Sequence, residues 1–209
     1  MLELAILGAL KEKPMHGYEL KKRLSYLLGH LWKISYGSLY PALKRLEAKN
    51  AVEKAYTVKE KTRNRYVYRI TPEGEETFQR LLVDTRKKSE ITDGDKFSLR
   101  LAFFQYMEPE LRLWLLERRR NYLEERLKEM SGAGKARERE PDSYRQGLYR
   151  HRQEQLESDI VWLEELIAQE RLHIQEMKKE REATLKEEKG GGKIVIEEGP
   201  LEKATPIQA

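Results

Sequence analysis

The chain contains no cysteine among its 209 residues. This absence excludes disulfide bonds, thiolate catalysis and zinc sites built on cysteine. No stretch approaches the roughly 18 consecutive apolar residues that a membrane-spanning helix needs, so we expect no membrane association. Because no charged-then-apolar leader precedes the first predicted helix, which begins almost at Met1, we expect a cytoplasmic protein.

Hydrophobic residues are also scarce, at 39% of the chain against 37% charged residues. Such a balance favours long helices with solvated faces over a thick layered core. The net charge of +5 is unevenly distributed: residues 1–84 hold 16 Lys and Arg against 10 Asp and Glu, whereas residues 85–209 hold 25 against 26. A localised basic surface is typical of nucleic-acid binders, although an excess of six charges also serves solubility alone.

The motifs of catalysis and of metal or cofactor binding are missing. The four histidines are scattered, and none pairs at i, i+4 with a carboxylate in a metal motif. The chain has no Walker glycine loop, no GxGxxG fingerprint and no nucleophile elbow. We therefore expect no enzyme, no metal and no cofactor.

Two helices are predicted in the first 28 residues. Apolar residues recur at helical spacing over residues 1–11 and again over 18–28. Pro14 ends the first segment, and Gly29 follows the second as a stop signal. Gly8 costs about 1 kcal/mol relative to Ala inside a helix, so its presence suggests a close helix crossing.

The run from Ser35 to Glu47 predicts a third, short helix. Three leucines recur at i, i+4 and i+7 and would face a core. Ser35 can cap the start of the helix, and Pro41 is expected in its first turn, where a missing N–H costs little. The remaining positions present hydroxyls, aromatic rings and cations, which form a face suited to phosphate.

After the third helix the hydrophobic period changes from that of a helix to that of a strand. β-branched and aromatic residues alternate over 52–58 and 65–70 around the polar loop 59–64, a pattern that predicts an antiparallel hairpin. Thr71 and Pro72 then open a fourth helix. Three helices followed by a basic-tipped hairpin is the order of a winged helix-turn-helix, whose third helix lies in the DNA major groove. A cationic hairpin tip by itself is more often a solvated turn.

The second half is predicted to be helical over 97–106, 109–130 and 142–189. In the last of these, apolar residues at alternating four- and three-residue steps predict a heptad seam. The seam, and the expected dimerisation surface, consists of Leu156, Ile160, Leu163, Ile167, Ile174 and Met177. So long a helix needs a partner, either the helix 109–130 of the same chain or a second copy of the protein. Residues 190–209 lack helical periodicity and are expected to form a flexible tail.

Three separate motifs, in residues 16–20, 37–47 and 65–74, resemble the N-terminal domain of PadR-family transcriptional regulators. The resemblance spans about residues 1–80. Through Phe97–Phe104, the remainder resembles the branch of the family that carries a Vir-activator-like alpha C-terminal domain. The resemblance implies a homodimeric DNA-binding regulator, usually a repressor, and in some relatives one that releases DNA on binding a phenolic acid or a drug.

The chain departs from this family in two places. Asn50-Ala51-Val52 stands where Gly-Leu-Ile is frequent, a mild change at the junction of helix and hairpin. Lys61-Thr62-Arg63-Asn64 replaces a frequent Gly-Arg-Pro at the hairpin tip, which keeps the positive charge but puts the shape of the loop in question.

We therefore predict a mainly α fold with a small β-hairpin. Residues 1–84 would form a winged helix-turn-helix, residues 85–189 a helical, coiled-coil dimerisation domain, and residues 190–209 a flexible tail. The residues expected at DNA lie on the third helix, the second helix or the hairpin: Tyr18, Ser35, Gly37, Ser38, Tyr40, Lys44, Arg45, Lys61, Arg63 and Arg65. The family resemblance is what places Tyr18 and Tyr40 at the DNA backbone, and partly buried core positions are the alternative for both.

A cluster of aromatic residues in the second half is the candidate pocket for a small aromatic effector: Phe103, Phe104, Tyr106 and Trp114. Plain core or dimer contact is the alternative for these side chains. The predicted partners are thus double-stranded DNA, a second copy of the chain and a small effector. The predicted function is a sequence-specific regulator, a repressor that binds a two-fold operator as a homodimer. The rival interpretation is a coiled-coil interaction protein without DNA binding, which leaves the basic hairpin without a purpose.

Overall fold

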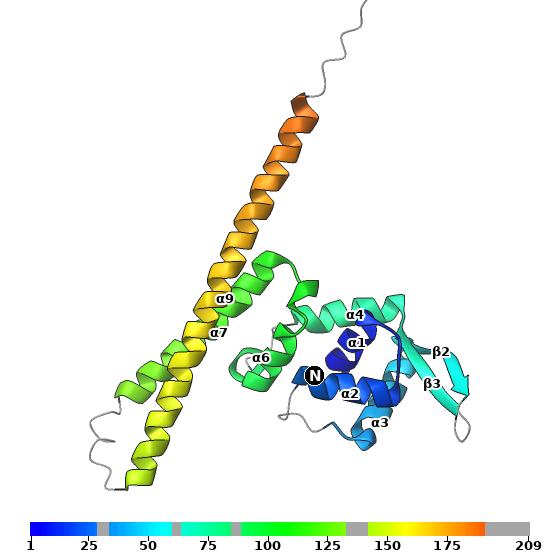
Figure 1. Ribbon diagram of the computed structural model, residues 1–209, viewed down its shortest axis with the longest axis horizontal. Coiled ribbons are helices and arrows are strands. Elements are labelled where there is room, and N and C mark those ends of the chain that lie inside the picture. Colours follow the sequence, from blue (N-terminus) through cyan, green and yellow to red (C-terminus); the bar gives the residue numbers. More distant parts are fainter. Residues whose placement is uncertain (29–33, 60–63, 85–88, 133–141, 191–209) are drawn as a thin grey trace, which may run out of the picture.

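The computed structural model contains a head of short elements joined to a pair of long helices (Figure 1). We call α1 through α4 with the sheet the head, and α7 with α9 the helical pair. The structure describes residues 1–28, 34–59, 64–84, 89–132 and 142–190.

The head follows the predicted order of a winged helix. Its elements are α1 (Leu2–Glu12), β1 (Met15–His16), α2 (Gly17–Leu28), α3 (Tyr36–Ala48), β2 (Val52–Lys59), β3 (Asn64–Ile70) and α4 (Pro72–Val83). Helix α1 lies at the centre, because it packs against α2, α3, α4 and β3. Every residue of α1 from Leu4 to Leu10 is buried, which explains why apolar positions cover so much of its surface.

The sheet has three antiparallel strands in the order β1-β3-β2. The hairpin of β2 and β3 runs from the pair Val52–Ile70 to the pair Lys59–Asn64, with an irregularity between Lys54 and Tyr56. Strand β1 pairs with β3 on the other side. The predicted hairpin is therefore confirmed, but the third strand was not foreseen, because two residues are too few to show an alternating pattern.

The start of α3 departs from prediction. Ser35 caps the helix, and its Oγ accepts the N–H of Ser38 at 3.1 Å. The helix consequently begins at Tyr36, so Pro41 lies inside it rather than in its first turn. The expectation for Pro41 was wrong because the cap, rather than the proline, sets the first residue. The helical hydrogen bond that an N–H at this position would give to the carbonyl of Gly37 is lost.

Helix α3 ends in a Schellman motif that also anchors α4. Asn50 has a φ of 55°, and the N–H of Ala51 bonds to the carbonyl of Leu46 at 2.9 Å, as this motif requires. Thr71 then caps α4 by accepting the N–H of Gly74 at 3.0 Å. A β-carbon on Gly74 would overlap the carbonyl oxygen of Ala51, so only glycine lets α4 start this close to the end of α3.

The segment between the head and the helical pair contains α5 (Ser89–Thr92), α6 (Gly94–Leu101) and the short 3-10 helix η2 (Phe104–Tyr106). The prediction of one helix over 97–106 was therefore wrong after Leu101. The break aims Phe103 into the head, where its ring occupies the space that a β-carbon on Gly8 would need. Gly8 thus accommodates an aromatic ring and not the crossing helix that was expected.

Two buried arginines fasten this segment through backbone carbonyls. Arg100 donates to the carbonyl of Leu82, and to that of Asp84 at 2.9 Å. Arg119 of α7 donates to the carbonyls of Ile91 and Thr92 at 2.5 and 2.9 Å. Burial lowers the pKa of Arg119. Carbonyl partners explain how two guanidinium groups can be buried.

The helical pair consists of α7 (Pro109–Gly132) and α9 (Ser143–Gly190), which run in opposite directions side by side. Of the predicted seam, Leu163, Ile167 and Ile174 are buried within this single chain. Leu156 and Ile160 are half-buried, whereas Met177 is 45% exposed. Packing on the helix of the same chain, one of the two alternatives for this seam, therefore accounts for its buried residues. No helix of the described ranges is both long enough and apolar enough to cross a membrane.

Candidate nucleic-acid interface

Helix α3 and the start of α2 form an exposed face that carries tyrosines and lysines. Tyr18 is 60% exposed, Tyr40 43% and Tyr36 39%. The rings of Tyr36 and Tyr40 stack with centroids 6.1 Å apart, and Lys21 Nζ lies 4.2 Å from the centroid of Tyr36. Because Leu39, Leu43 and Leu46 hold the opposite side of α3 in the core, this face is turned toward solvent.

Most cations of the head are paired with carboxylates, and the exceptions gather on this face. The paired ones are Lys11 with Glu75, Lys13 with Glu19, Arg23 with Glu12, Arg45 and Lys49 with Glu3, Lys54 with Glu47, and Arg69 with Glu53. Within the described residues, Lys21 and Lys22 of α2 and Lys44 of α3 have no carboxylate partner. The uncompensated positive charge of the described head therefore lies on α2 and α3, apart from Arg80, which bonds to Thr77.

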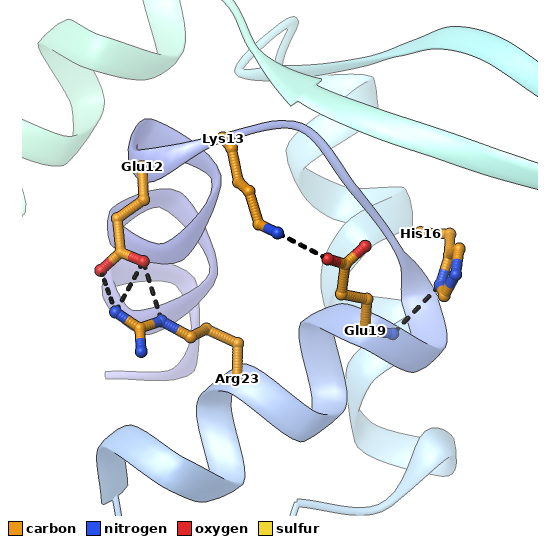
Figure 2. A network of polar contacts seen from close by, with 5 residues as sticks. All are labelled: Glu12, Lys13, His16, Glu19 and Arg23. Atoms are coloured by element: carbon orange, nitrogen blue, oxygen red, sulfur yellow. Dashed lines mark hydrogen bonds and ion pairs between the residues drawn. The ribbon is translucent and has the colours of Figure 1, made fainter.

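A network at the junction of α1 and α2 shows how the paired cations are used (Figure 2). Arg23 donates from Nε and Nη2 to the two carboxylate oxygens of Glu12, each at 2.8 Å, and this pair raises the pKa of the guanidinium. Lys13 donates to Glu19 at 2.8 Å, and this hydrogen bond lowers the pKa of the carboxyl. These two cations fasten α2 to the preceding chain and are neutralised in doing so.

The predicted DNA residues at the start of α3 are exposed together. Ser35, Gly37 and Ser38 lie at the surface. The hydroxyl groups of the two serines are already bonded locally, since Ser35 Oγ accepts the N–H of Ser38 at 3.1 Å and Ser38 Oγ donates to the carbonyl of Ser35 at 3.0 Å. Tyr40 lies one turn after Tyr36 on α3, and Lys44 lies two turns after it, so the three residues share one face of the helix.

Other predicted residues lie elsewhere or beyond what the structure describes. Arg45 points away from Tyr40 toward α1, where its Nε lies 3.5 Å from Glu3. Lys61 and Arg63 lie outside the described residues. Arg65 belongs to β3 by its backbone, but its side chain is also outside the description.

The described part of the hairpin adds tyrosines and one more paired cation. Tyr56 and Tyr66 are exposed, and Lys54 Nζ lies 5.0 Å from the ring centroid of Tyr66. The hydrogen bond with Glu47 raises the pKa of Lys54. Because Glu47 belongs to α3, its ion pair with Lys54 links the hairpin to that helix. Burial raises the pKa of the nearby Tyr68.

Sequence reasoning missed Tyr36, Lys21 and Lys22 as members of this face. The run Lys21-Lys22-Arg23 shows three cations in a row, and only the position of Glu12 on α1 separates the paired arginine from the lysines. Tyr36 could have been found by its spacing, because it lies four residues before Tyr40 and therefore on the same side of α3.

The four aromatic residues predicted to form an effector pocket are separated in the structure. Phe103 and Tyr106 each pack edge-on against Phe78 of α4, at 5.7 and 5.6 Å between centroids. Phe104 faces Phe97 of α6 at 6.3 Å. Trp114 is exposed beneath Arg118 on α7. Core packing, the alternative considered for this cluster, therefore describes Phe103 and Tyr106.

Phe104 borders a cavity of about 390 Å³ between η2 and the helical pair. Apolar and polar side chains share its wall: Leu101, Phe104, Arg112, Leu116, Leu166, Gln169, Glu170 and His173. Arg112 and Glu170 form an ion pair of 2.8 Å there. In the described part of the chain, no group of three or more histidine, aspartate or glutamate side chains could hold a metal ion.

Comparison with known proteins agrees with this architecture. A family model described as the transcriptional regulator PadR-like family matches residues 6–80. The negative transcriptional regulator PadR of Bacillus subtilis is 26% identical over 103 residues, which cover 49% of this chain and 56% of that protein. An uncharacterized 37.1 kDa protein in transposon TN4556 of Streptomyces fradiae is 38% identical over 78 residues, which cover 37% of this chain and 21% of that protein.

A solved structure of Bacillus subtilis PadR in complex with operator DNA is similar with a TM-score of 0.41 and 22% identity, over 81% of this chain and 98% of that one. The matched region thus spans about a fifth of one curated relative and just over half of the other. The matched family, whose model covers the winged helix, is one of transcriptional regulators. The chain belongs to the PadR-like family of these regulators.

Proposed function

We propose that the chain is a sequence-specific DNA-binding repressor of the cytoplasm, in which residues 1–84 read DNA and residues 85–189 join two copies. One observation carries the proposal: the cations left without carboxylates in the described head gather on the exposed face of α2 and α3. In a winged helix this third helix enters the major groove. The exposed tyrosines beside it offer hydroxyls and ring faces to the sugar-phosphate backbone.

We divide the proposed contacts into three groups. Tyr18, Ser35, Gly37, Ser38, Tyr40 and Lys44 remain proposed contacts, and Tyr36, Lys21 and Lys22 join them. Arg45 is proposed only as a residue that exchanges Glu3 for a phosphate on binding. Lys61, Arg63 and Arg65 remain proposed contacts of the hairpin.

A matched pair of double variants tests the DNA face. Lys21→Ala with Lys44→Ala removes two unpaired cations, whereas Lys11→Ala with Lys49→Ala removes two cations that face Glu75 and Glu3. Both variants lower the net charge equally. Fluorescence anisotropy on DNA from upstream of the gene should show that only the first lowers the slope of log affinity against log salt, by about two. Equal slopes for both variants would contradict the proposed face, and no binding by the wild type would contradict DNA binding itself.

A homodimer is supported by the apolar side chains that α9 leaves exposed. Leu172 is 60% exposed and Val161 55%, and Trp162 and Met177 are exposed as well. Two winged helices on a two-fold site also contact more phosphates than one. Sedimentation equilibrium should therefore give twice the chain mass of 24.8 kDa, and a monomer at micromolar concentration would contradict this part of the proposal.

Repression is supported by the Bacillus subtilis relative, which is named a negative regulator. A reporter driven by the upstream region of the gene should lose expression when the protein is supplied. An increase in expression would identify an activator instead.

Release by a small aromatic effector is supported by the cavity beside Phe104. Its wall offers apolar side chains for a ring, and Arg112 would exchange Glu170 for an acidic group of the effector. Arg112→Met should abolish any release of DNA that aromatic carboxylic acids cause, without changing the affinity for DNA in their absence. Release that persists in this variant would place the effector elsewhere.

A further inference from the structure

We propose that His16 and Gly17 are positioning residues of the DNA face: they fix the start of α2 so that Tyr18 and Tyr40 keep their places. This inference rests on the proposed function, because it concerns residues behind the same face. Neither residue is among the proposed DNA contacts, and each acts through a different interaction.

His16 caps α2 with its side chain. It is the last residue of β1, where the ladder to Val67 of β3 fixes its backbone. Its Nδ1 accepts the backbone N–H of Glu19 at 3.1 Å (Figure 2), so a neutral imidazole does here what serine or aspartate does at most helix starts. The bond requires the proton of the ring to sit on Nε2. Tyr18 follows two residues later, and its ring centroid lies 6.3 Å from that of His16.

Gly17 leaves room for the ring of Tyr40. A β-carbon on Gly17 would lie 2.7 Å from the Tyr40 hydroxyl and 3.0 Å from its Cζ. Both distances are too short for unbonded atoms, so any other residue would displace the ring. Because Tyr40 is half-exposed on α3, the ring would swing into solvent, which is where the proposal places DNA.

Other ionisable side chains lie around the imidazole of His16. From α2 it faces Glu19, whose carboxylate is held by Lys13 from the preceding loop, an interaction that keeps the pKa of Glu19 low. Tyrosines lie near the corner on two elements, with Tyr18 on α2 and Tyr40 on α3. Histidine is the side-chain type among these whose charge ordinarily changes between pH 5 and 8.

The direction of the pH effect follows from the cap. A protonated imidazole has no lone pair on Nδ1, so the N–H of Glu19 loses its acceptor and the start of α2 loosens. Lys13 also opposes a second cation beside Glu19. DNA affinity should therefore fall as the pH is lowered from 8 to 5.5.

Asparagine and glutamine variants separate the cap from other roles of the side chain. His16→Asn keeps an acceptor near the place of Nδ1 but cannot titrate, and His16→Gln places its acceptor near Nε2 instead. At pH 8 we expect His16→Asn to bind DNA like the wild type and His16→Gln to bind about fivefold more weakly, the factor equivalent to one lost cap. The affinity of His16→Asn should change less with pH than that of the wild type.

Thr71→Ala is the matched control within the same head, because it removes the side-chain cap of α4 and the bond from the Thr71 hydroxyl to the carbonyl of Asn50, at the far end of α3 from Tyr36. Helices α3 and α4 lie on opposite sides of α1 (Figure 1). Thr71→Ala should lower the melting temperature and leave DNA affinity unchanged. The cap role of His16 is overturned if His16→Gln binds as tightly as the wild type, if Thr71→Ala weakens binding equally, or if wild-type affinity rises at acid pH.

Gly17→Ala tests the contact between Gly17 and Tyr40, because it should lower DNA affinity without lowering the stability of the fold. Alanine is the better helix former, so the melting temperature should hold or rise. DNA affinity should nevertheless fall by about threefold or more, the range of one lost contact. In a Tyr40→Ala background, Gly17→Ala should cause no further loss, and an additional loss there would overturn the role of Gly17. A wild-type protein that binds no DNA would overturn the proposed function itself, whereas the outcomes above overturn only this inference.

Discussion

The head and the helical pair distribute their apolar side chains differently. Helix α1 has 11 residues and buries seven of them in a row, from Leu4 to Leu10. Helix α9 has 48 residues, and among its described side chains only Leu163, Ile167 and Ile174 are buried. Most helical stability in proteins comes from packing. The helices of the head bury their apolar side chains within the head, whereas α9 packs on α7 and leaves other apolar side chains exposed.

The closest packing of the head should make it the part most sensitive to a single added atom. Gly74→Ala forces a β-carbon into the carbonyl of Ala51, so α4 must separate from α3. We expect a loss of about 3 kcal/mol or more in the free energy of unfolding, measured by urea denaturation. A loss below about 1 kcal/mol would show that the head is as tolerant as the helical pair.

Two leucines on α9 test the corresponding difference within the helical pair. Leu163 is buried against the same chain and Leu172 is exposed. Leu163→Ala should lower the free energy of unfolding by about 2–4 kcal/mol through loss of buried surface and the cavity left behind. Leu172→Ala should weaken self-association in sedimentation and leave the unfolding of a dissociated chain unchanged. A reversal of the two results would mean that α9 packs on α7 through its other side.

Glycine at position 50 should stabilise the head by a smaller amount. Asn50 occupies a left-handed conformation with a φ of 55°, which glycine adopts without steric cost. Asn50→Gly should therefore raise the free energy of unfolding by about 0.5–1 kcal/mol. A decrease would show that the asparagine side chain makes a stabilising contact of its own.

The surface ion pairs of the head should contribute least. Lys13 lowers the pKa of Glu19, so the pair stabilises the head at neutral pH, where Glu19 is ionised in both states. That contribution disappears as the pH falls through the lowered pKa and the folded state takes up a proton. Lys13→Met should cost less than about 1 kcal/mol at pH 7, and the difference from wild type should vanish once Glu19 is protonated in the folded state. A difference that persists at acid pH would mean that Lys13 acts through packing.

The elements of the head could be predicted because each has a local signal. The leucine spacing of α3, the cap at Thr71 and the alternation of β2 and β3 all lie within a few residues. Strand β1 carries no such signal, because its pairing with β3 depends on residues about fifty positions away. The position of Pro41 was predicted wrongly because the preference of proline for the first turn of a helix was outweighed by the cap at Ser35.

The candidate site was predictable by residue type but not by partner. Sequence identifies Arg45 and Lys44 as neighbouring cations, but only the fold brings Glu3 to Arg45 and leaves Lys44 unpaired. The same applies to Phe103 and Phe104. The two are neighbours in the sequence, but Phe103 packs on Phe78 of α4 and Phe104 on Phe97 of α6.

That divergence of adjacent rings has a mechanical consequence. Phe103 is seated in the head against Gly8 and Phe78, while Phe104 is seated beside the cavity of the helical pair. The two residues are adjacent in the chain, so a displacement of Phe104 beside the cavity would act on the neighbour of a ring packed in the head against Gly8 and Phe78.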